Sequence, residues 1–297
     1  MAQVGNTPLL RFDSLTRSWP LIQILGKVEW ANPGGSVKDR AALNIVETAL
    51  RSGLLGSGRR LLDATSGNTG IAYAMIGAAQ GIPVTLCLPA HVSHERKRIL
   101  AAFGAEIVWT DPQEGTDGSI RKARELNESH PGKYFYADQY SNPANWLAHY
   151  RGTANEIWSQ TEGAITHFVA GLGTSGTFMG TTRRLKELNP AIRAISMQPD
   201  SALHGLEGLK HMATALVPKI YDPSLADASL EISTEAAYEM MKRVARSEGV
   251  LVGISAGAAL VACEKVAEQA RQDEPMVIVT VLPDSCDRYL SENFWDE

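Results

Sequence analysis

Short runs of aliphatic and β-branched residues alternate along the chain with longer stretches in which apolar residues recur every three or four positions. The short runs predict strands at 26–30, 60–64, 84–88, 105–109, 133–136, 166–170, 194–198, 250–252 and 276–282. The longer stretches predict helices at 41–46, 71–80, 93–103, 116–129, 144–160, 175–188, 234–248 and 258–271. Residues 200–232 lose this period, which predicts a long loop region of the kind that often carries function.

The alternation of strands and helices predicts an α/β fold built of two three-layer units, whose mostly parallel sheets are covered by helices on both faces. A length of 297 residues fits two such units better than one. We place their boundary at Asn142-Pro143, which gives domains at 1–141 and 142–297, with the stretch 1–30 able to pack on the second domain. Ligands of such folds bind in the loops at the carboxyl ends of the strands.

The composition is that of a globular protein, with 44% hydrophobic residues and a formal net charge of −5. The chain has no basic cluster, which argues against nucleic acid and anionic membranes as partners. It also lacks an apolar run of about 20 residues and a signal-peptide pattern, so we expect a cytoplasmic protein. Three scattered cysteines, Cys87, Cys263 and Cys286, argue against a disulfide framework and a zinc site, and we expect no metal.

The loop 32–40 places Lys38 in the first turn of a predicted helix. Ser36 and Asp39 have the spacing of a capping box, which predicts Ser36 as the N-cap. A cation is disfavoured at this positive end of the helix dipole by roughly 0.3–1 kcal/mol, and Arg40 adds a second positive charge. Both effects, together with burial, favour the neutral and nucleophilic amine of Lys38. The loop by itself would indicate only a solvated surface lysine, so its meaning depends on the other loops.

The turn Gly171-Leu172-Gly173-Thr174-Ser175-Gly176 joins a predicted strand to a predicted helix and matches the dinucleotide-binding fingerprint. Asp200 follows the next strand, near where a ribose-binding acid belongs, so an NAD-binding oxidoreductase is one interpretation. The hydroxyls of Thr174, Ser175 and Thr177 better suit the terminal phosphate of a smaller cofactor, which backbone N–H groups at a helix N-terminus bind. A plain tight turn is the third possibility.

The pentapeptide Gly253-Ile254-Ser255-Ala256-Gly257 lies between a predicted strand and a predicted helix and matches the nucleophile elbow of serine hydrolases. That fold needs a histidine after the serine, and none of the seven histidines follows Ser255. We therefore interpret Ser255 as a neutral hydroxyl that faces a ligand, with a structural N-cap as the alternative.

The turn Thr65-Ser66-Gly67-Asn68-Thr69-Gly70 carries three hydroxyls and one amide, whereas helix capping would need a single such residue. Such a turn can surround a carboxylate with hydrogen-bond donors. A neutral lysine, a phosphate-binding turn, a carboxylate-binding turn and a serine at a helix start are together what pyridoxal 5′-phosphate chemistry requires. A nicotinamide enzyme would leave Lys38 and this turn without a task.

These motifs, in this order and spacing, resemble those of the cysteine synthases (O-acetylserine sulfhydrylases) of pyridoxal-phosphate fold type II, which is similar to tryptophan synthase β. The resemblance extends from Gly5-Asn6-Thr7-Pro8-Leu9 to Pro283-Asp284-Ser285, and residues 204–222 are more similar to the B-type enzymes. It implies that Lys38 forms the Schiff base with the cofactor and later removes the Cα proton of the substrate. It also implies that Asn68 contacts the cofactor's ring oxygen.

The same resemblance assigns further residues to the cofactor and the substrate. Ser255 would face the pyridine nitrogen of the cofactor. A neutral serine does not keep this nitrogen protonated, so the carbanion is less stabilised. Elimination at Cβ is then favoured over transamination. The phosphate would be bound by Gly173, Thr174, Ser175, Gly176 and Thr177, and the substrate carboxylate by Thr65, Ser66, Gly67, Asn68, Thr69 and Gln139. Lys210 lies near the place where one B-type branch carries a cation for the phosphate of O-phosphoserine, with an ordinary solvated lysine as the alternative.

The activity that the resemblance implies is a β-replacement that forms L-cysteine from O-acetylserine or O-phosphoserine and a sulfur donor. That donor could be sulfide, thiosulfate or a protein thiocarboxylate. A homodimer is the family expectation, with a serine acetyltransferase or a sulfur-carrier protein as a further partner. Two positions depart from the family pattern, because Ser175 and Cys286 stand where glycine is common, and we expect Cys286 to be a packing thiol.

Four other functions remain as alternatives. Cystathionine β-synthases share the motifs but usually carry added segments, for which 297 residues leave no room. Serine and threonine dehydratases, which stop at β-elimination, normally lack the Asp39-Arg40 pair after the lysine. An NAD-binding oxidoreductase rests on the turn 171–176 alone. A non-catalytic binding homologue would not need Lys38, Asn68 and Ser255.

Overall fold

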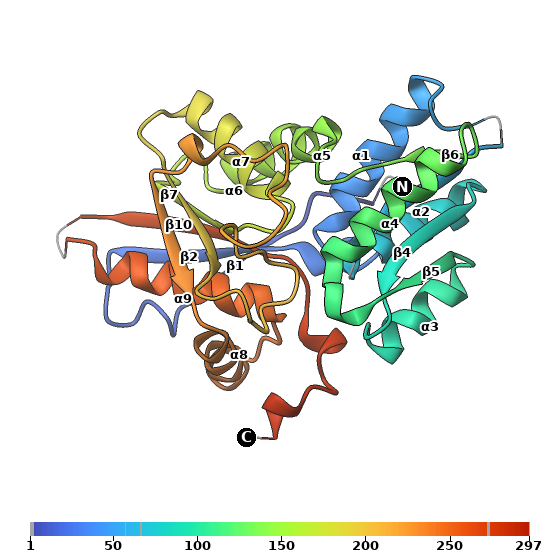
Figure 1. The fold of residues 1–297 in the computed structure, drawn as a ribbon. Helices are drawn as coiled ribbons and strands as arrows, with labels where there is room; N and C mark the ends of the chain where they lie inside the picture. The colour runs from blue at the N-terminus through green and yellow to red at the C-terminus, as the bar shows by residue number, and fades with distance from the viewer. Residues whose placement is uncertain (1–2, 57, 66, 272–273, 297) are drawn as a thin grey trace.

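The computed structural model describes residues 3–56, 58–65, 67–271 and 274–296, and their strands form two sheets (Figure 1). The larger sheet contains, in spatial order, β1 (Leu9–Arg11), β2 (Ile22–Val28), β10 (Met276–Leu282), β7 (His167–Gly171), β8 (Arg193–Pro199) and β9 (Ala228–Ile232). The smaller sheet contains β5 (Glu106–Thr110), β4 (Val84–Pro89), β3 (Arg60–Ala64) and β6 (Tyr134–Tyr136). All neighbouring strands run parallel except β1 and β2. The predicted α/β class with mostly parallel sheets is confirmed.

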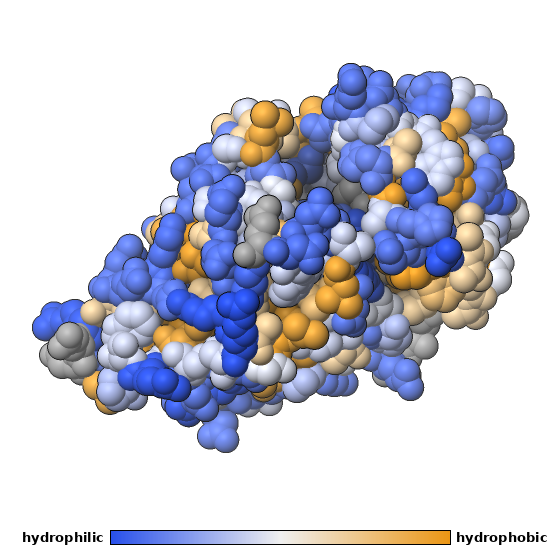
Figure 2. All heavy atoms as spheres, turned by 90° about the horizontal axis from the view of Figure 1, so that it is seen from below, coloured by the Kyte–Doolittle hydropathy of each residue, from blue (hydrophilic) through white to orange (hydrophobic). Residues whose placement is uncertain are grey.

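Helices follow most strands, as the hydrophobic pattern predicts. The helices are α1 (Lys38–Arg51), α2 (Asn68–Gln80), α3 (His94–Ala102), α4 (Gly115–Ser129), α5 (Pro143–Ala148), α6 (Ala154–Gln160), α7 (Gly176–Leu188), α8 (Thr234–Glu248) and α9 (Ile254–Glu268). Short 3-10 turns occupy Glu29–Ala31, Pro112–Glu114, Pro223–Leu225, Cys286–Arg288 and Asn293–Trp295. None of the helices in the described ranges is long and apolar enough to cross a membrane. On the face drawn in Figure 2, hydrophobic residues form small groups among hydrophilic ones.

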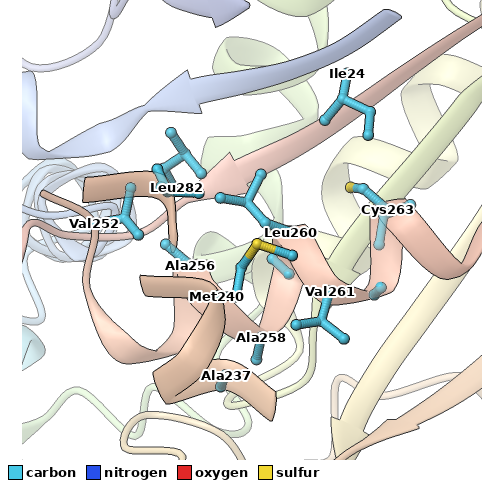
Figure 3. Packing of buried hydrophobic residues seen from close by; sticks show 14 of the residues in the cluster. Ile24, Ala237, Met240, Val252, Ala256, Ala258, Leu260, Val261, Cys263 and Leu282 are labelled. Atoms are coloured by element: carbon cyan, nitrogen blue, oxygen red, sulfur yellow. The ribbon is translucent and has the colours of Figure 1, made fainter. Parts of the chain in front are cut away.

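The larger sheet is the middle layer of three, because its strands bury side chains on both faces. In β10, Ile278 and Leu282 pack with α8 and α9, as the close view in Figure 3 shows for Leu282. Val279 and Val281 alternate with them and pack on the other side with α6 and α7. This period of two along a parallel strand explains why the strand is apolar throughout.

The smaller sheet has the same construction. Leu61 and Leu86 join the hydrophobic cluster that contains residues of α1 and α2. Leu62 and Cys87, which are their neighbours in sequence, join the cluster that contains residues of α4 on the opposite face. Figure 1 shows the smaller sheet on the right and the larger sheet on the left.

Several predicted elements are corrected by the structure. The strand predicted at 26–30 begins earlier, at Ile22, and the segment 250–252 forms only an isolated bridge between Val252 and Ser285. The helix predicted at 258–271 begins at Ile254. The single helix predicted at 144–160 is interrupted by a π-helical turn at His149–Thr153.

The N-terminal strands belong to the larger sheet. β2 pairs along its whole length with β10, and β1 pairs with β2 from the outside. Neither β1 nor β9 was expected from the hydrophobic pattern, because β1 has only three residues and β9 is a five-residue edge strand inside the loop region 200–232. The division into domains at 141/142 stays a prediction.

Candidate active site

A cavity of about 850 Å³ opens where the carboxyl ends of strands from both sheets face each other. Its walls contain the N-terminal residues of α1, α7 and α9 and the loop that follows β3. The described site residues predicted from the sequence all line it: Lys38, Thr65, Gly67, Asn68, Thr69, Gln139, Gly173, Thr174, Ser175, Gly176, Thr177, Lys210 and Ser255. Ser66, the remaining predicted site residue, lies outside the described residues.

Lys38 is the first residue of α1, but the capping box predicted before it does not form. The N-cap is Val37, and the Ser36 hydroxyl accepts a long hydrogen bond of 3.3 Å from the backbone N–H of Lys38. The Asp39 carboxylate turns back to accept from the backbone N–H of Gly34 at 2.5 Å. Burial lowers the pKa of Lys38, and the negative charge of Asp284 opposes this shift. The amine is therefore more often neutral than that of an ordinary lysine.

Arg40 does not act on Lys38 as its position in the sequence suggests. Its guanidinium donates to Glu29 at 2.7 Å and to Glu156 at 2.7 Å, and both carboxylates are largely buried. The expectation that Arg40 lowers the pKa of Lys38 is corrected, because these partners balance its charge and burial is the main cause of the shift.

The loop after β3 is held by its own hydrogen bonds. The Thr65 hydroxyl accepts from the backbone N–H of Gly67 at 3.1 Å. The Thr69 hydroxyl donates to the side-chain oxygen of Gln139 at 2.8 Å, and the Gln139 amide donates to the carbonyl of Ala64 at 2.7 Å. Gln139 and the loop, which are far apart in the sequence, therefore form one unit.

The loop before α7 has the geometry of an anion site. Ser175 adopts a left-handed backbone with φ of 66°, and its buried hydroxyl has no partner among the described residues. The next residue has to be glycine, because a Cβ at position 176 would overlap the side chain of Asn145. The Asn145 amide in turn donates to the Thr174 hydroxyl at 3.0 Å. An anion at the N-terminus of α7 would give Ser175 the acceptor that it lacks.

Ser255 lies in the first turn of α9, whose N-cap is Gly253, so the alternative interpretation of Ser255 as an N-cap is wrong. Its side chain is 6% exposed and lines the cavity. Asp284, a buried residue just after β10 that the sequence interpretation did not assign to the site, lines the same cavity.

Asp284 accepts hydrogen bonds from the Asn68 amide at 2.7 Å and from the Tyr289 hydroxyl at 2.7 Å. Arg288 donates to the Asn68 side-chain oxygen and to the carbonyl of Gly34. Asp284 lies just after β10, at the carboxyl end of a parallel strand. This position in the sequence could have indicated Asp284 as a site residue. Its contact with Asn68 fixes the side chain that was expected to bind the cofactor.

Two cations at the cavity are paired with acids. Lys210 is 8% exposed and donates to Asp117 at 2.8 Å, so the alternative of a solvated lysine is wrong. Arg96, from α3, pairs with Glu207. Both pairs join helices that pack on the smaller sheet to the loop 204–216. The charges of Lys210 and Arg96 are thus compensated within the protein.

Cys286 packs as expected. It is fully buried in the hydrophobic cluster between α8, α9 and the larger sheet, and burial raises the pKa of its thiol. It is not one of the described residues that line the cavity. Cys87 and Cys263 are also free and buried.

The residues of the cavity fit pyridoxal phosphate. The unpartnered Ser175 hydroxyl and the N-terminus of α7 suit its phosphate, and the amine of Lys38 suits its aldehyde. Ser255 offers a neutral hydroxyl, and Gln139, with one amide hydrogen bound to Ala64, has its second amide hydrogen available for an amino-acid carboxylate.

Comparisons with known proteins agree with this chemistry. Residues 1–284 match the family model described as pyridoxal-phosphate dependent enzyme. A cysteine synthase of Aquifex aeolicus is 53% identical over 97% of this chain and 89% of its own length. Cysteine synthase B of Pseudomonas aeruginosa is 41% identical, with 99% of this chain and 96% of that protein covered. A crystal structure of cysteine synthase from Entamoeba histolytica has a TM-score of 0.93 at 36% identity, covering 100% of this chain and 90% of that one.

One relative corrects an argument from chain length. A Bacillus subtilis protein named O-acetylserine dependent cystathionine beta-synthase is 37% identical over 99% of this chain and 96% of its own length. A chain of 297 residues is therefore long enough for a protein of that name. The interpretation as an NAD-binding oxidoreductase is excluded by the family match. The chain belongs to the cysteine synthase family of pyridoxal-phosphate-dependent enzymes.

Proposed function

We propose that this protein forms L-cysteine from an activated serine and a sulfur donor by pyridoxal-phosphate-dependent β-replacement. The observation that carries the proposal is that Lys38, the start of α7 with the unpartnered Ser175 hydroxyl, and the polar loop after β3 all line one cavity. Bound pyridoxal phosphate supplies an electron sink for the carbanion at the substrate Cα.

Lys38 removes the Cα proton. Burial lowers its pKa, which favours the unprotonated amine that a base requires. Asp284, the buried acid near this amine, limits the shift and stabilises the ammonium that forms when the proton is taken up. Asp284 also holds Asn68 in place beside the cofactor position.

The loop after β3 binds the carboxylate of the amino-acid substrate. Thr69 and Gln139 are already joined by a hydrogen bond, so the loop is ordered before substrate arrives and little entropy is lost on binding. Gln139 uses one amide hydrogen for Ala64 and keeps the second for the carboxylate.

The charge balance of the cavity supports O-acetylserine as the substrate rather than O-phosphoserine. Lys210 and Arg96 are occupied by Asp117 and Glu207, so a phosphate group would have to displace a carboxylate from its partner. An acetyl group needs no such exchange. The role of Lys210 in binding a substrate phosphate stays a prediction, and Lys210→Ala tests it, because a loss confined to O-phosphoserine would support it.

The test of the proposed function uses the purified holoenzyme. We expect the absorption band of bound pyridoxal phosphate to change on addition of O-acetylserine, and cysteine to form once sulfide is added. Lys38→Ala lowers cysteine formation by about 10³-fold or more, whereas the matched control Lys122→Ala, on the surface of α4, leaves it unchanged. A protein that binds no pyridoxal phosphate, or a Lys38→Ala variant with full activity, would overturn the proposal.

A cystathionine β-synthase activity is the second candidate, because of the relative with that name. The two functions differ in the nucleophile, so L-homocysteine and sulfide are compared at equal concentrations with O-acetylserine. We expect sulfide to give the larger kcat/KM, and a larger value for homocysteine would favour the second candidate.

The assembly and the location stay predictions from the sequence. They are a cytoplasmic homodimer, with a serine acetyltransferase or a sulfur-carrier protein as a further partner. Size-exclusion chromatography with light scattering tests the dimer directly.

A further inference from the structure

His149 is a buried histidine that neither the sequence interpretation nor the proposed chemistry uses. It begins the π-helical turn His149–Thr153 and is 2% exposed. Its Nδ1 lies 2.9 Å from the hydroxyl oxygen of Thr153, and its Nε2 lies 3.3 Å from the hydroxyl oxygen of Thr177 in α7. The imidazole thus connects the inside of the turn to the helix start that faces the cavity.

The close packing of α7 against this turn makes the contact possible. A Cβ on Gly180 would overlap the carbonyl of Trp146 and crowd the Cβ of His149, so only glycine allows this approach. π-helical turns within α-helices are rare and occur frequently at functional sites.

The imidazole of His149 is neutral at physiological pH. Burial lowers its pKa well below the ordinary value, and the positive charges of Arg40 and Lys38 lower it further, while Glu156 opposes the shift. A neutral imidazole has one nitrogen that carries a hydrogen and one that accepts. The hydrogen bonds with Thr153 and Thr177 decide which nitrogen is which.

Thr153 determines which nitrogen carries the hydrogen. Its side chain is fully buried, and among the described residues its hydroxyl has one hydrogen-bond contact, with Nδ1 of His149. A buried hydroxyl hydrogen requires an acceptor, so Thr153 donates to Nδ1. Nε2 then carries the imidazole hydrogen and donates to Thr177.

We propose that the chain from Thr153 through His149 to Thr177 orients the Thr177 hydroxyl so that its hydrogen points into the cavity as a donor to the cofactor phosphate. The proposal rests on the proposed assignment of the loop 173–177 to that phosphate. Without His149, the Thr177 hydroxyl could rotate and present a lone pair to the anion. His149 is a positioning residue, because it acts on the phosphate only through Thr177.

Nuclear magnetic resonance of the holoenzyme labelled with ¹⁵N-histidine tests the proton position directly. We expect the signal of His149, assigned with a His149→Gln variant, to be that of the Nε2-protonated tautomer and to stay constant from about pH 5.5 to 8.5. A hydrogen on Nδ1, or an imidazolium in this range, would overturn the proposal.

Cofactor binding to the apoprotein separates orientation from general stability. Thr153→Val keeps the shape and removes the donor to Nδ1, and we expect it to weaken pyridoxal phosphate binding about fivefold while the affinity for pyridoxal, which lacks the phosphate, stays unchanged. Thr161→Val removes a buried hydroxyl that donates to the carbonyl of Ile157 in α6, and serves as the matched control. Unchanged pyridoxal phosphate affinity, or an equal loss for both ligands, contradicts the inference, whereas a wild-type apoprotein that binds no pyridoxal phosphate contradicts the proposed function.

Discussion

At the scale of single residues, the candidate site depends on buried polar groups whose ionisation the fold controls. Asp63, the residue before the last of β3, is fully buried and accepts from the backbone N–H groups of Ala64 at 2.8 Å and Gln139 at 3.3 Å. Burial raises its pKa to about 7, and the neighbouring Asp138 adds to the shift. The carboxyl behind the substrate loop is therefore neutral over much of the acidic range.

This shift predicts a pH dependence of stability. In the unfolded chain Asp63 ionises near pH 3.8, and in the folded protein near pH 7, so the folded state holds the extra proton between these values. The contribution of Asp63 to the free energy of unfolding is therefore greatest below pH 3.8. It falls by at most about 1.4 kcal/mol per pH unit as the pH rises from there toward 7. Asp63→Asn, which cannot ionise, should lose this part of the slope in urea unfolding at pH 4.5 and 7. The surface control Glu128→Gln should keep it, and parallel curves for wild type and Asp63→Asn would contradict the prediction.

Ser175 predicts opposite effects on stability and on cofactor binding. A non-glycine residue in the left-handed region costs roughly 1–2 kcal/mol, and its unpartnered hydroxyl adds to the strain. Ser175→Gly should therefore stabilise the apoprotein by about 1 kcal/mol in thermal or urea unfolding. The same variant should bind pyridoxal phosphate more weakly, because the phosphate loses one donor. A gain in both quantities would show that the hydroxyl does not contact the phosphate.

At the scale of secondary-structure elements, a buried ion network fixes the start of α1. Arg40 joins Glu29, next to β2, to Glu156 on α6, and Glu156 also pairs with the fully buried Lys27 at 2.7 Å. The start of α1 is thus held both to the end of β2 and to α6, although Arg40 and Glu156 are 116 positions apart in the sequence.

Removing one member of this network should be costly. Glu156→Gln leaves Lys27 buried without its carboxylate, and breaking a buried pair in this way costs about 3 kcal/mol. The matched control is Glu106→Gln, whose carboxylate pairs with Arg60 at the surface and should change stability by less than about 1 kcal/mol. Urea unfolding of both variants checks the difference, and equal effects would contradict the role of burial.

The sequence predicted most of the strands and helices and the loops that line the cavity, because hydrophobic periods and glycine-rich turns are local signals, but it did not predict the short strand β1 or the edge strand β9. The contact between His149 and Thr177 was not predictable, since a π-helical turn leaves the apolar spacing of 144–160 almost unchanged. The hydrogen bond from the backbone N–H of Gly34 to the Asp39 carboxylate was also missed. The predicted capping box uses the same carboxylate, so the sequence does not distinguish the two arrangements. The acid partner of Asn68 lies 216 positions away, and only the packing of the two sheets brings it there.

At the scale of the whole molecule, the cavity is bounded by two charge pairs that link the helices of the smaller sheet to the loop 204–216. Arg96 with Glu207 forms one, and Lys210 with Asp117 forms the other. Each pair leaves its cation without net charge to offer a substrate.

Neutralising one acid should therefore change substrate preference. Glu207→Gln and Asp117→Asn each release a cation, so the ratio of kcat/KM for O-phosphoserine to that for O-acetylserine should rise, by up to about tenfold. Glu292→Gln is the control, because Glu292 lines the cavity without an ion pair among the described residues. An unchanged ratio in both test variants would mean that charge pairing does not select the substrate.

The position of β10 between β2 and β7 has a consequence for the order in which the molecule is made. The four strands of the smaller sheet lie in one continuous stretch, from Arg60 to Tyr136, and can pair while the ribosome is still adding residues. β2 is synthesised before them but waits for residues 276–282, its partner on the inner side, which follow the whole smaller sheet in the sequence. Pairing across such a sequence distance is slow, so the nascent chain carries an unpaired strand edge until residues 276–282 have been made, and the cavity cannot be completed before then.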